Sequence, residues 1–209
     1  MKIQKKRRQS FDLLQAQKQH AAGNLFDAEI IYKKILERDH NQPDALHLLG
    51  VLAHQLNDPK KAIKLISRAL TLRPDFSEAF NNLGNAYIDL KLFKKAIESY
   101  NSALKIKKDY QIAQNNLANA FFQFGNHLNK KGRYEEAKIN YVESLKIKPN
   151  NSEANYNLGV TFSNLEKYDE AEKSYRASIL INPNHAEPYS NLGNVLVKLK
   201  KNNEAIESY

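Results

Sequence analysis

The sequence predicts an all-α protein built from stacked helix-turn-helix repeats, because residues of several kinds recur at one fixed interval. Each of these pairs is separated by 34 residues: Leu49 and Leu83, Leu158 and Leu192, Ala62 and Ala96, Pro149 and Pro183, Tyr175 and Tyr209. Self-similarity at such an interval is typical of an α-solenoid, in which neighbouring repeats bury one shared core.

The interval divides the chain into six units, each with its Leu-Gly pair at positions seven and eight. The units are 9–42, 43–76, 77–110, 111–151, 152–185 and an incomplete 186–209. In the third unit Phe80, Leu83 and Tyr87 lie three and four residues apart, which is the spacing of an amphipathic helix. We expect Gly84 to let two helices approach closely and Tyr100 to fill the space beside it.

The predicted turns carry residues that stop and start helices. Three prolines stand just past second helices, where a proline ends a helix without disrupting it: Pro74, Pro149 and Pro183. Ser77 and Ser152 occupy predicted N-cap positions. Asp58-Pro59 is predicted to be a cap followed by the first helical residue.

The fourth unit is seven residues longer than the others. Leu117-Ala118 matches the repeat motif once, and Phe124-Gly125 matches it again seven residues later. Seven residues are almost two helical turns, so the insertion lengthens a helix and preserves its face. We therefore expect one long helix near residues 111–130 that protrudes beyond its neighbours.

The last unit ends within its predicted second helix. Ala205 to Tyr209 repeats the residues of Ala96 to Tyr100, after which the third unit continues with further helical residues. The sequence is therefore expected to be a fragment of a longer array.

The pattern of Leu-Gly, a large residue, Ala, Tyr and Pro over residues 9–209 resembles the tetratricopeptide repeat. That resemblance implies a right-handed superhelix of antiparallel helix pairs, whose first helices line a concave groove. It also implies a scaffold that holds an extended peptide or a partner helix in this groove.

Asparagine recurs at positions six and nine of the first helices, which face away from the predicted packed side. The candidate peptide-binding residues are Asn82, Asn85, Asn116, Asn119, Asn126, Asn157, Asn191 and Asn194. A carboxamide donates and accepts hydrogen bonds, so it can pair with both halves of a peptide bond. Asparagine is also a poor helix former. The alternative is that these residues only reflect the repeat consensus and an asparagine-rich composition.

The asparagine series resembles the superhelical arm of O-linked N-acetylglucosamine transferases. The segment from His47 to His54 is similar to the arms of bacterial proteins that carry a glycosyltransferase or sulfotransferase domain. This resemblance implies a second possible function, a substrate-recognition arm whose catalytic domain is encoded after Tyr209.

A third possibility is nucleic-acid binding through the basic N-terminal tail, residues 1–8. Five of the charges behind the formal net charge of +9 lie in this tail: Lys2, Lys5, Lys6, Arg7 and Arg8. No recognisable nucleic-acid module accompanies them, so a solvated tail is the ordinary interpretation.

Composition excludes several kinds of site and segment. The absence of cysteine excludes disulfides and thiolate metal sites, and no apolar run is long enough to cross a membrane. No secretory signal is apparent, so a cytoplasmic protein is expected.

No catalytic, cofactor or metal site is predicted. His20, His47 and His54 share a face, but their spacing is a weak metal signal. No phosphate-binding loop or nucleophile elbow is present. At the N-terminal end of the groove, Leu14, Leu48 and Val51 replace asparagine. They form either an apolar docking patch for a partner or second copy, or a more tightly packed start of the array.

Overall fold

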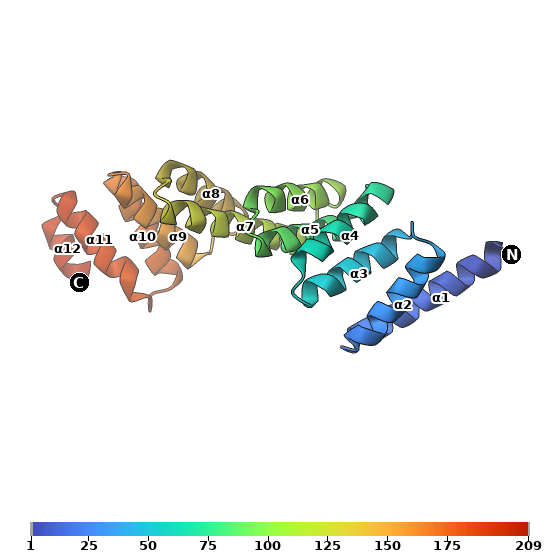
Figure 1. Cartoon of the computed structure of the whole chain (residues 1–209). Coiled ribbons are helices and arrows are strands. Elements are labelled where there is room, and N and C mark those ends of the chain that lie inside the picture. The colour runs from blue at the N-terminus through green and yellow to red at the C-terminus, as the bar shows by residue number, and fades with distance from the viewer. Residues whose placement is uncertain (1, 209) are drawn as a thin grey trace. The chain divides into compact units, whose positions relative to one another are not determined.

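The computed structural model describes residues 2–208, with side chains described for residues 11–208. Within this range the chain forms twelve α-helices and no strand (Figure 1). The basic side chains of residues 2–8 lie outside the described side chains, although their backbone belongs to the first helix.

The helices form two compact units, residues 1–113 and 114–209, with the division inside α7. The first unit contains α1 (Lys2–Ala21), α2 (Leu25–Arg38), α3 (Pro43–Gln55), α4 (Pro59–Leu72), α5 (Ser77–Asp89) and α6 (Phe93–Ile106). The second contains most of α7 (Gln111–Lys130), then α8 (Tyr134–Ile147), α9 (Ser152–Asn164), α10 (Tyr168–Ile181), α11 (Ala186–Lys198) and α12 (Asn202–Ser208).

The helix boundaries coincide with the predicted boundaries of the repeats. The first helices begin at residues 43, 77, 111, 152 and 186, which are the predicted first residues of their units. In the first unit α1 packs on α2, α3 on α4 and α5 on α6, and α2 and α4 also pack on the first helix that follows them. In the second unit α9 packs on α10 and α11 on α12, and α8 and α10 also pack on the first helix that follows them. The predicted prolines all lie just beyond second helices, as expected.

Near residues 111–130, where a long helix was predicted, α7 has 20 residues, whereas α5 and α9 have 13 each. Its second motif, Phe124-Gly125, is the one that meets the following helix as other repeats do: Gly125 faces Tyr141 as Gly159 faces Tyr175. The extra two turns therefore precede Ala118.

The hairpin turns share a conformation that the sequence analysis did not anticipate. One residue in each turn has a positive φ: Gly23, Asn57, Lys91, Gly132, Glu166 and Lys200. Counting the fourth repeat from Ala118, all six occupy the fifteenth position. The left-handed conformation closes each helix end and turns the chain back.

The prediction for the N-caps was partly wrong. Asp58 caps α4 as predicted, since its Oδ1 accepts from the Lys61 amide at 3.0 Å. Ser152, however, is the first residue of α9, and the cap is Asn151, whose Oδ1 accepts from the Ala154 amide at 3.0 Å. The Ser152 hydroxyl instead donates to the Ser178 carbonyl of α10 at 3.1 Å. Ser77 likewise opens α5, and its cap position holds Phe76.

Small residues and one large residue per hairpin build the core. In the first unit a buried cluster joins α3, α4 and α5: Ala53, Ala62, Ile66, Leu70, Ala79, Leu83 and Ala86. In the second unit Leu128, Ala137, Tyr141 and Leu158 join α7, α8 and α9. Each repeat thus buries its apolar face against both neighbours within its unit.

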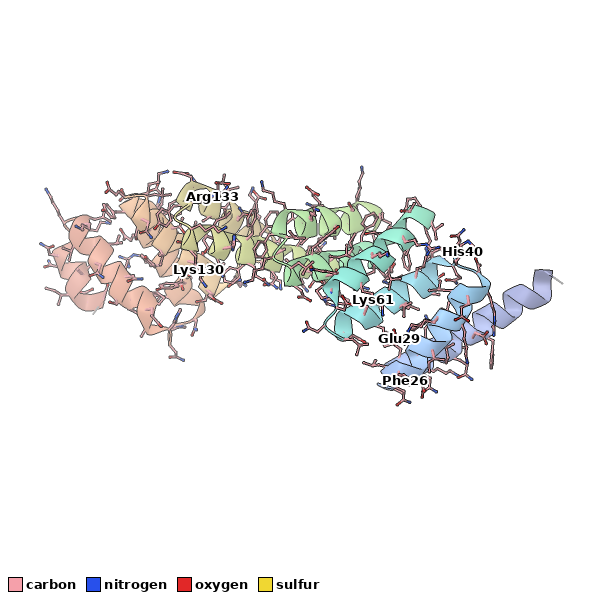
Figure 2. The ribbon with its side chains drawn as sticks, viewed as in Figure 1. Phe26, Glu29, His40, Lys61, Lys130 and Arg133 are labelled. Carbon is pink, nitrogen blue, oxygen red and sulfur yellow. The ribbon has the colours of Figure 1, made fainter. Side chains whose placement is uncertain are left out.

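Ion pairs connect successive second helices on their exposed side. The Lys61 ammonium on α4 lies 3.1 Å from the Glu29 carboxylate on α2 (Figure 2), and that of Lys167, the N-cap residue of α10, lies 2.9 Å from the Glu135 carboxylate on α8. Surface pairs of this kind each contribute little to stability. Their positions follow the repeat register, but they contribute little to the stability of the stack.

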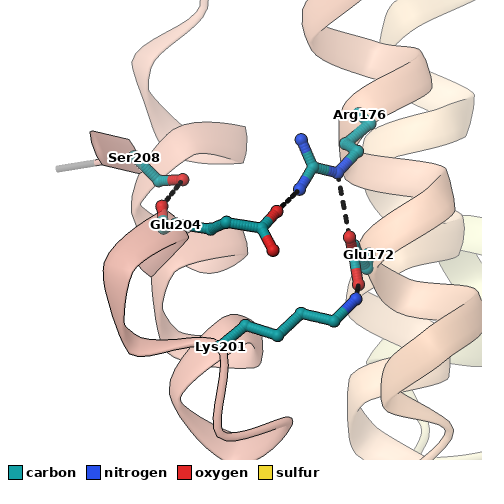
Figure 3. Close-up of polar contacts among 5 residues, drawn as sticks. All are labelled: Glu172, Arg176, Lys201, Glu204 and Ser208. Atoms are coloured by element: carbon teal, nitrogen blue, oxygen red, sulfur yellow. Dashed lines mark hydrogen bonds and ion pairs between the residues drawn. The ribbon is translucent and has the colours of Figure 1, made fainter. Parts of the chain in front are cut away.

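The last two second helices carry a larger network (Figure 3). Glu172 on α10 accepts from Arg176 at 3.0 Å and from Lys201, the residue before α12, at 2.8 Å. Arg176 also donates to Glu204 on α12 at 2.6 Å. The two cations together hold the pKa of the Glu172 carboxyl below its usual value, although burial opposes them.

Candidate functional site

In several repeats a tyrosine of the second helix packs against a glycine of the first helix and holds a neighbouring asparagine side chain. At Gly84 a Cβ atom would lie 2.5 Å from the Tyr100 ring, so only glycine lets that ring lie so close to α5. The ring passes Gly84, and its hydroxyl donates to Oδ1 of Asn85 at 2.8 Å. The same arrangement recurs at Gly125, where the Tyr141 hydroxyl donates to Asn126 at 2.7 Å.

Burial keeps these tyrosine hydroxyls protonated. It raises the pKa of Tyr141 to about 12 and raises that of Tyr100 as well. Each hydroxyl therefore serves as a donor, which fixes the carbonyl oxygen of its asparagine toward the second helix.

Other predicted asparagines bond to the neighbouring first helix. Nδ2 of Asn82 lies 2.9 Å from Nε2 of His47, and Nδ2 of Asn191 donates to the Tyr156 hydroxyl at 3.2 Å. Asn157 donates to Asn126 at 3.0 Å. The carboxamides are thus partly used to connect successive repeats, a role that the sequence analysis did not predict.

These internal bonds do not bury the asparagines of the second unit. Asn116 and Asn119 border a hollow of about 220 Å³, Asn191 and Asn194 border one of about 270 Å³, and Asn157 borders one of about 860 Å³. A carboxamide has two donor hydrogens and an acceptor oxygen, so one internal bond does not exhaust it. The predicted residues of this unit therefore lie where a ligand could reach them.

The largest of these hollows has walls from three parts of the second unit. The loop between α8 and α9 contributes Lys148 and Asn150, the first turns of α9 contribute Glu153 and Tyr156, and the end of α10 contributes Ile181, Asn182 and the following His185. Tyr156 and His185 meet edge to face with ring centroids 5.3 Å apart. Of the lining residues, only Asn157 was a predicted site residue.

His47 is a buried titratable group on α3. Burial lowers the pKa of its imidazole to about 4, which the nearby Asp44 only partly opposes. The ring is therefore neutral at pH 7, and its Nε2 accepts from Asn82. The ring also meets the Phe76 ring edge to face, at 4.6 Å between ring centroids.

The histidines that share this face have separate partners. Nε2 of His20 lies 2.6 Å from Oε1 of Gln55, and Nε2 of His54 lies 2.6 Å from Oδ2 of Asp89. Among the described residues no group of three or more His, Asp or Glu side chains could hold a metal ion.

The three apolar residues of the first unit differ in exposure. Leu14 is half exposed, whereas Leu48 is partly buried and packs against the cluster around Tyr32 and Leu52; Val51 is also partly buried. An apolar docking patch at these residues stays a prediction.

Comparison with known families identifies the repeat. Models described as tetratricopeptide repeat match residues 75–150, 152–185 and 186–209. The chain belongs to the tetratricopeptide-repeat (TPR) family. A model described as anaphase-promoting complex, cyclosome, subunit 3 also matches residues 21–103. No curated protein matches the sequence.

Solved structures of TPR proteins share the fold. A crystal structure of MamA is 24% identical and has a TM-score of 0.62, covering 80% of this chain and 94% of that one. YrrB, described as a TPR protein with an unusual peptide-binding site, is 20% identical with a TM-score of 0.57, covering 85% and 88%. PilF of Pseudomonas aeruginosa is 18% identical with a TM-score of 0.57, covering 96% and 88%.

TPR arrays are typically non-catalytic protein-interaction modules. No helix in the described part of this TPR chain is both long and apolar enough to pass through a bilayer.

Proposed function

We propose that this TPR chain is a scaffold that binds an extended segment of a partner protein along the exposed face of its first helices. The observation that carries the proposal is the clustering of hollows in the second unit. Five predicted asparagines border three of them: Asn116, Asn119, Asn157, Asn191 and Asn194.

The internal hydrogen bonds favour binding rather than compete with it. Asn157 and Asn191 are each held in one orientation by a bond to the neighbouring repeat. A side chain that is already ordered loses less conformational entropy when a ligand arrives. Its remaining hydrogen-bonding capacity can pair with peptide N–H and C=O groups, whatever side chains the peptide carries.

The TPR fold supports this function in general terms. YrrB shares the fold and is described as having a peptide-binding site, but at 20% identity the likeness concerns the fold alone. The residues named above therefore rest on this chain's own geometry.

The test is to select binders from a library of random linear peptides and to measure their affinities by fluorescence anisotropy. Replacing Asn119, Asn157 and Asn194 together with alanine should weaken the selected peptides about tenfold or more, since several hydrogen bonds are lost. The matched control replaces Asn101 and Asn184, which are exposed outside the three hollows. Circular dichroism melting curves of both variants show whether the fold is retained.

Equal affinities of the triple variant, the control and the original chain would contradict the proposal. A library that yields no binder at all would contradict it as well.

A further inference from the structure

Two equivalent places, one in each unit, are built alike but differ in one ion pair. In the first unit the place lies between α3 and the end of α4. Here Arg73, the C-cap residue of α4, donates to the Asp44 carboxylate at 2.6 Å. Its guanidinium lies 3.6 Å from the centroid of the Phe76 ring, which in turn packs against His47.

The second unit repeats this construction position by position. Glu153 corresponds to Asp44, Tyr156 to His47 and His185 to Phe76. Each aromatic residue on the first helix bonds to an asparagine of the next repeat, His47 to Asn82 and Tyr156 to Asn191. The two ring pairs are also alike, since both meet edge to face.

The second of these places has no counterpart of the Arg73 guanidinium. The residue that corresponds to Arg73 is Asn182, which is uncharged and shorter. Among the described residues no basic side chain forms an ion pair with Glu153. The place that the arginine occupies in the first unit is part of the hollow of about 860 Å³ in the second.

We propose that this hollow receives an arginine side chain of the partner polypeptide. The inference rests on the proposed function and names the residue that the scaffold selects. The incoming guanidinium takes the place that Arg73 has in the first unit, stacked over the His185 ring and paired with the Glu153 carboxylate.

Arginine suits this hollow better than lysine does. A planar guanidinium can stack on a ring and bind a carboxylate through two N–H groups at once, whereas an ammonium cannot. Lys148 also lines the hollow, so the local charge is not strongly negative. Selection therefore comes from stacking and hydrogen-bond geometry more than from net charge.

The substitution Asn182→Arg tests this directly, because it should supply the missing cation from the chain itself. The backbone accepts it: Asn182 has φ −135° and ψ 87°, and Arg73 has φ −138° and ψ 89°. The new side chain should pair with Glu153 and fill the hollow. Asn184→Arg is the matched control, since it adds the same charge at an exposed position outside the hollow.

The probe is a capped pentapeptide with one central arginine among glycine and serine residues. Its counterpart carries citrulline, which keeps the shape and removes the charge. Titration into the ¹⁵N-labelled chain should shift the amide signals of residues 148–157 and 181–185, with the citrulline peptide about fivefold weaker or more. Asn182→Arg should abolish these shifts, and Asn184→Arg should leave them unchanged. Glu153→Gln should weaken the arginine peptide about tenfold.

Three results would each overturn the inference: equal binding of the arginine and citrulline peptides, unchanged binding by Asn182→Arg, or no shift with the arginine peptide at millimolar concentration. Library peptides that bind normally to Asn182→Arg would leave the scaffold function standing and remove only the arginine site. Failure of the original chain to bind any library peptide would count against both.

Discussion

The Tyr141 hydroxyl reaches past Gly125 and donates to Oδ1 of Asn126 at 2.7 Å. Asn126 accepts a second bond from Asn157 on the next first helix. One carboxamide thereby connects the two helices of its own hairpin with the following repeat. The core of a repeat and its exposed face are therefore parts of one hydrogen-bonded arrangement.

Removing that hydroxyl tests the arrangement. Tyr141→Phe retains the ring packing but leaves Asn126 without one donor, so the free energy of unfolding should fall by about 0.5–1.5 kcal/mol. Urea denaturation followed by circular dichroism measures the change. Tyr134→Phe, in the first turn of the same helix, is the control, and equal stability of both variants would show that the bond contributes nothing.

Replacing Gly84 by a large residue should lower the free energy of unfolding more than Tyr141→Phe does. Gly84→Leu places a side chain where even a Cβ atom would lie 2.5 Å from the buried Tyr100 ring. Overpacking of this kind should lower the free energy of unfolding by about 1–3 kcal/mol. Asn101→Leu adds a leucine at an exposed position of α6 and should have little effect on the same thermal unfolding measurement. An unchanged melting temperature of Gly84→Leu would contradict the helix register.

Acid should destabilise the first unit through His47. Its folded-state pKa is about 4, below the usual value of 6.5, because burial penalises the charged ring. The unfolded chain binds the proton more readily between these values, so stability is complete above about pH 6.5 and falls as pH decreases toward 4. The loss should reach about 3 kcal/mol.

The pH dependence is assigned by substitution. Denaturation curves between pH 4 and 7 should flatten for His47→Gln but not for the exposed His40→Gln. The same slope in His47→Gln and the original chain would place the titrating group elsewhere.

The cap of α4 makes a smaller contribution. Asp58→Ala removes the acceptor of the Lys61 amide, so it should cost about 0.5–2 kcal/mol of stability. Asp75→Ala, in the exposed turn before α5, provides the comparison in the same urea titration. A cost no larger than that of Asp75→Ala would remove Asp58 from the capping role.

Much of the candidate site was beyond sequence reasoning for a physical reason. Asn82 and Asn157 could be placed on the correct helices by periodicity, yet their partners His47 and Asn126 lie on neighbouring repeats. Which residues of neighbouring repeats meet depends on how the hairpins stack, and the spacing of residues along one helix does not determine this. Asn182 carries no signal of its own, since it matters only by comparison with Arg73.

The sequence by itself determined the helices, their order and the long α7, because the 34-residue interval and the helical period are properties of the chain alone. Tertiary structure alone decided which side chains meet. The N-cap of α9 is Asn151, and several of the predicted asparagines bond to neighbouring repeats. Arg73 fills the place beside Asp44, whereas the equivalent place beside Glu153 and Asn182 is a hollow. Packing sets these outcomes, since hydrogen bonds and ion pairs form only between groups that stacking brings within reach.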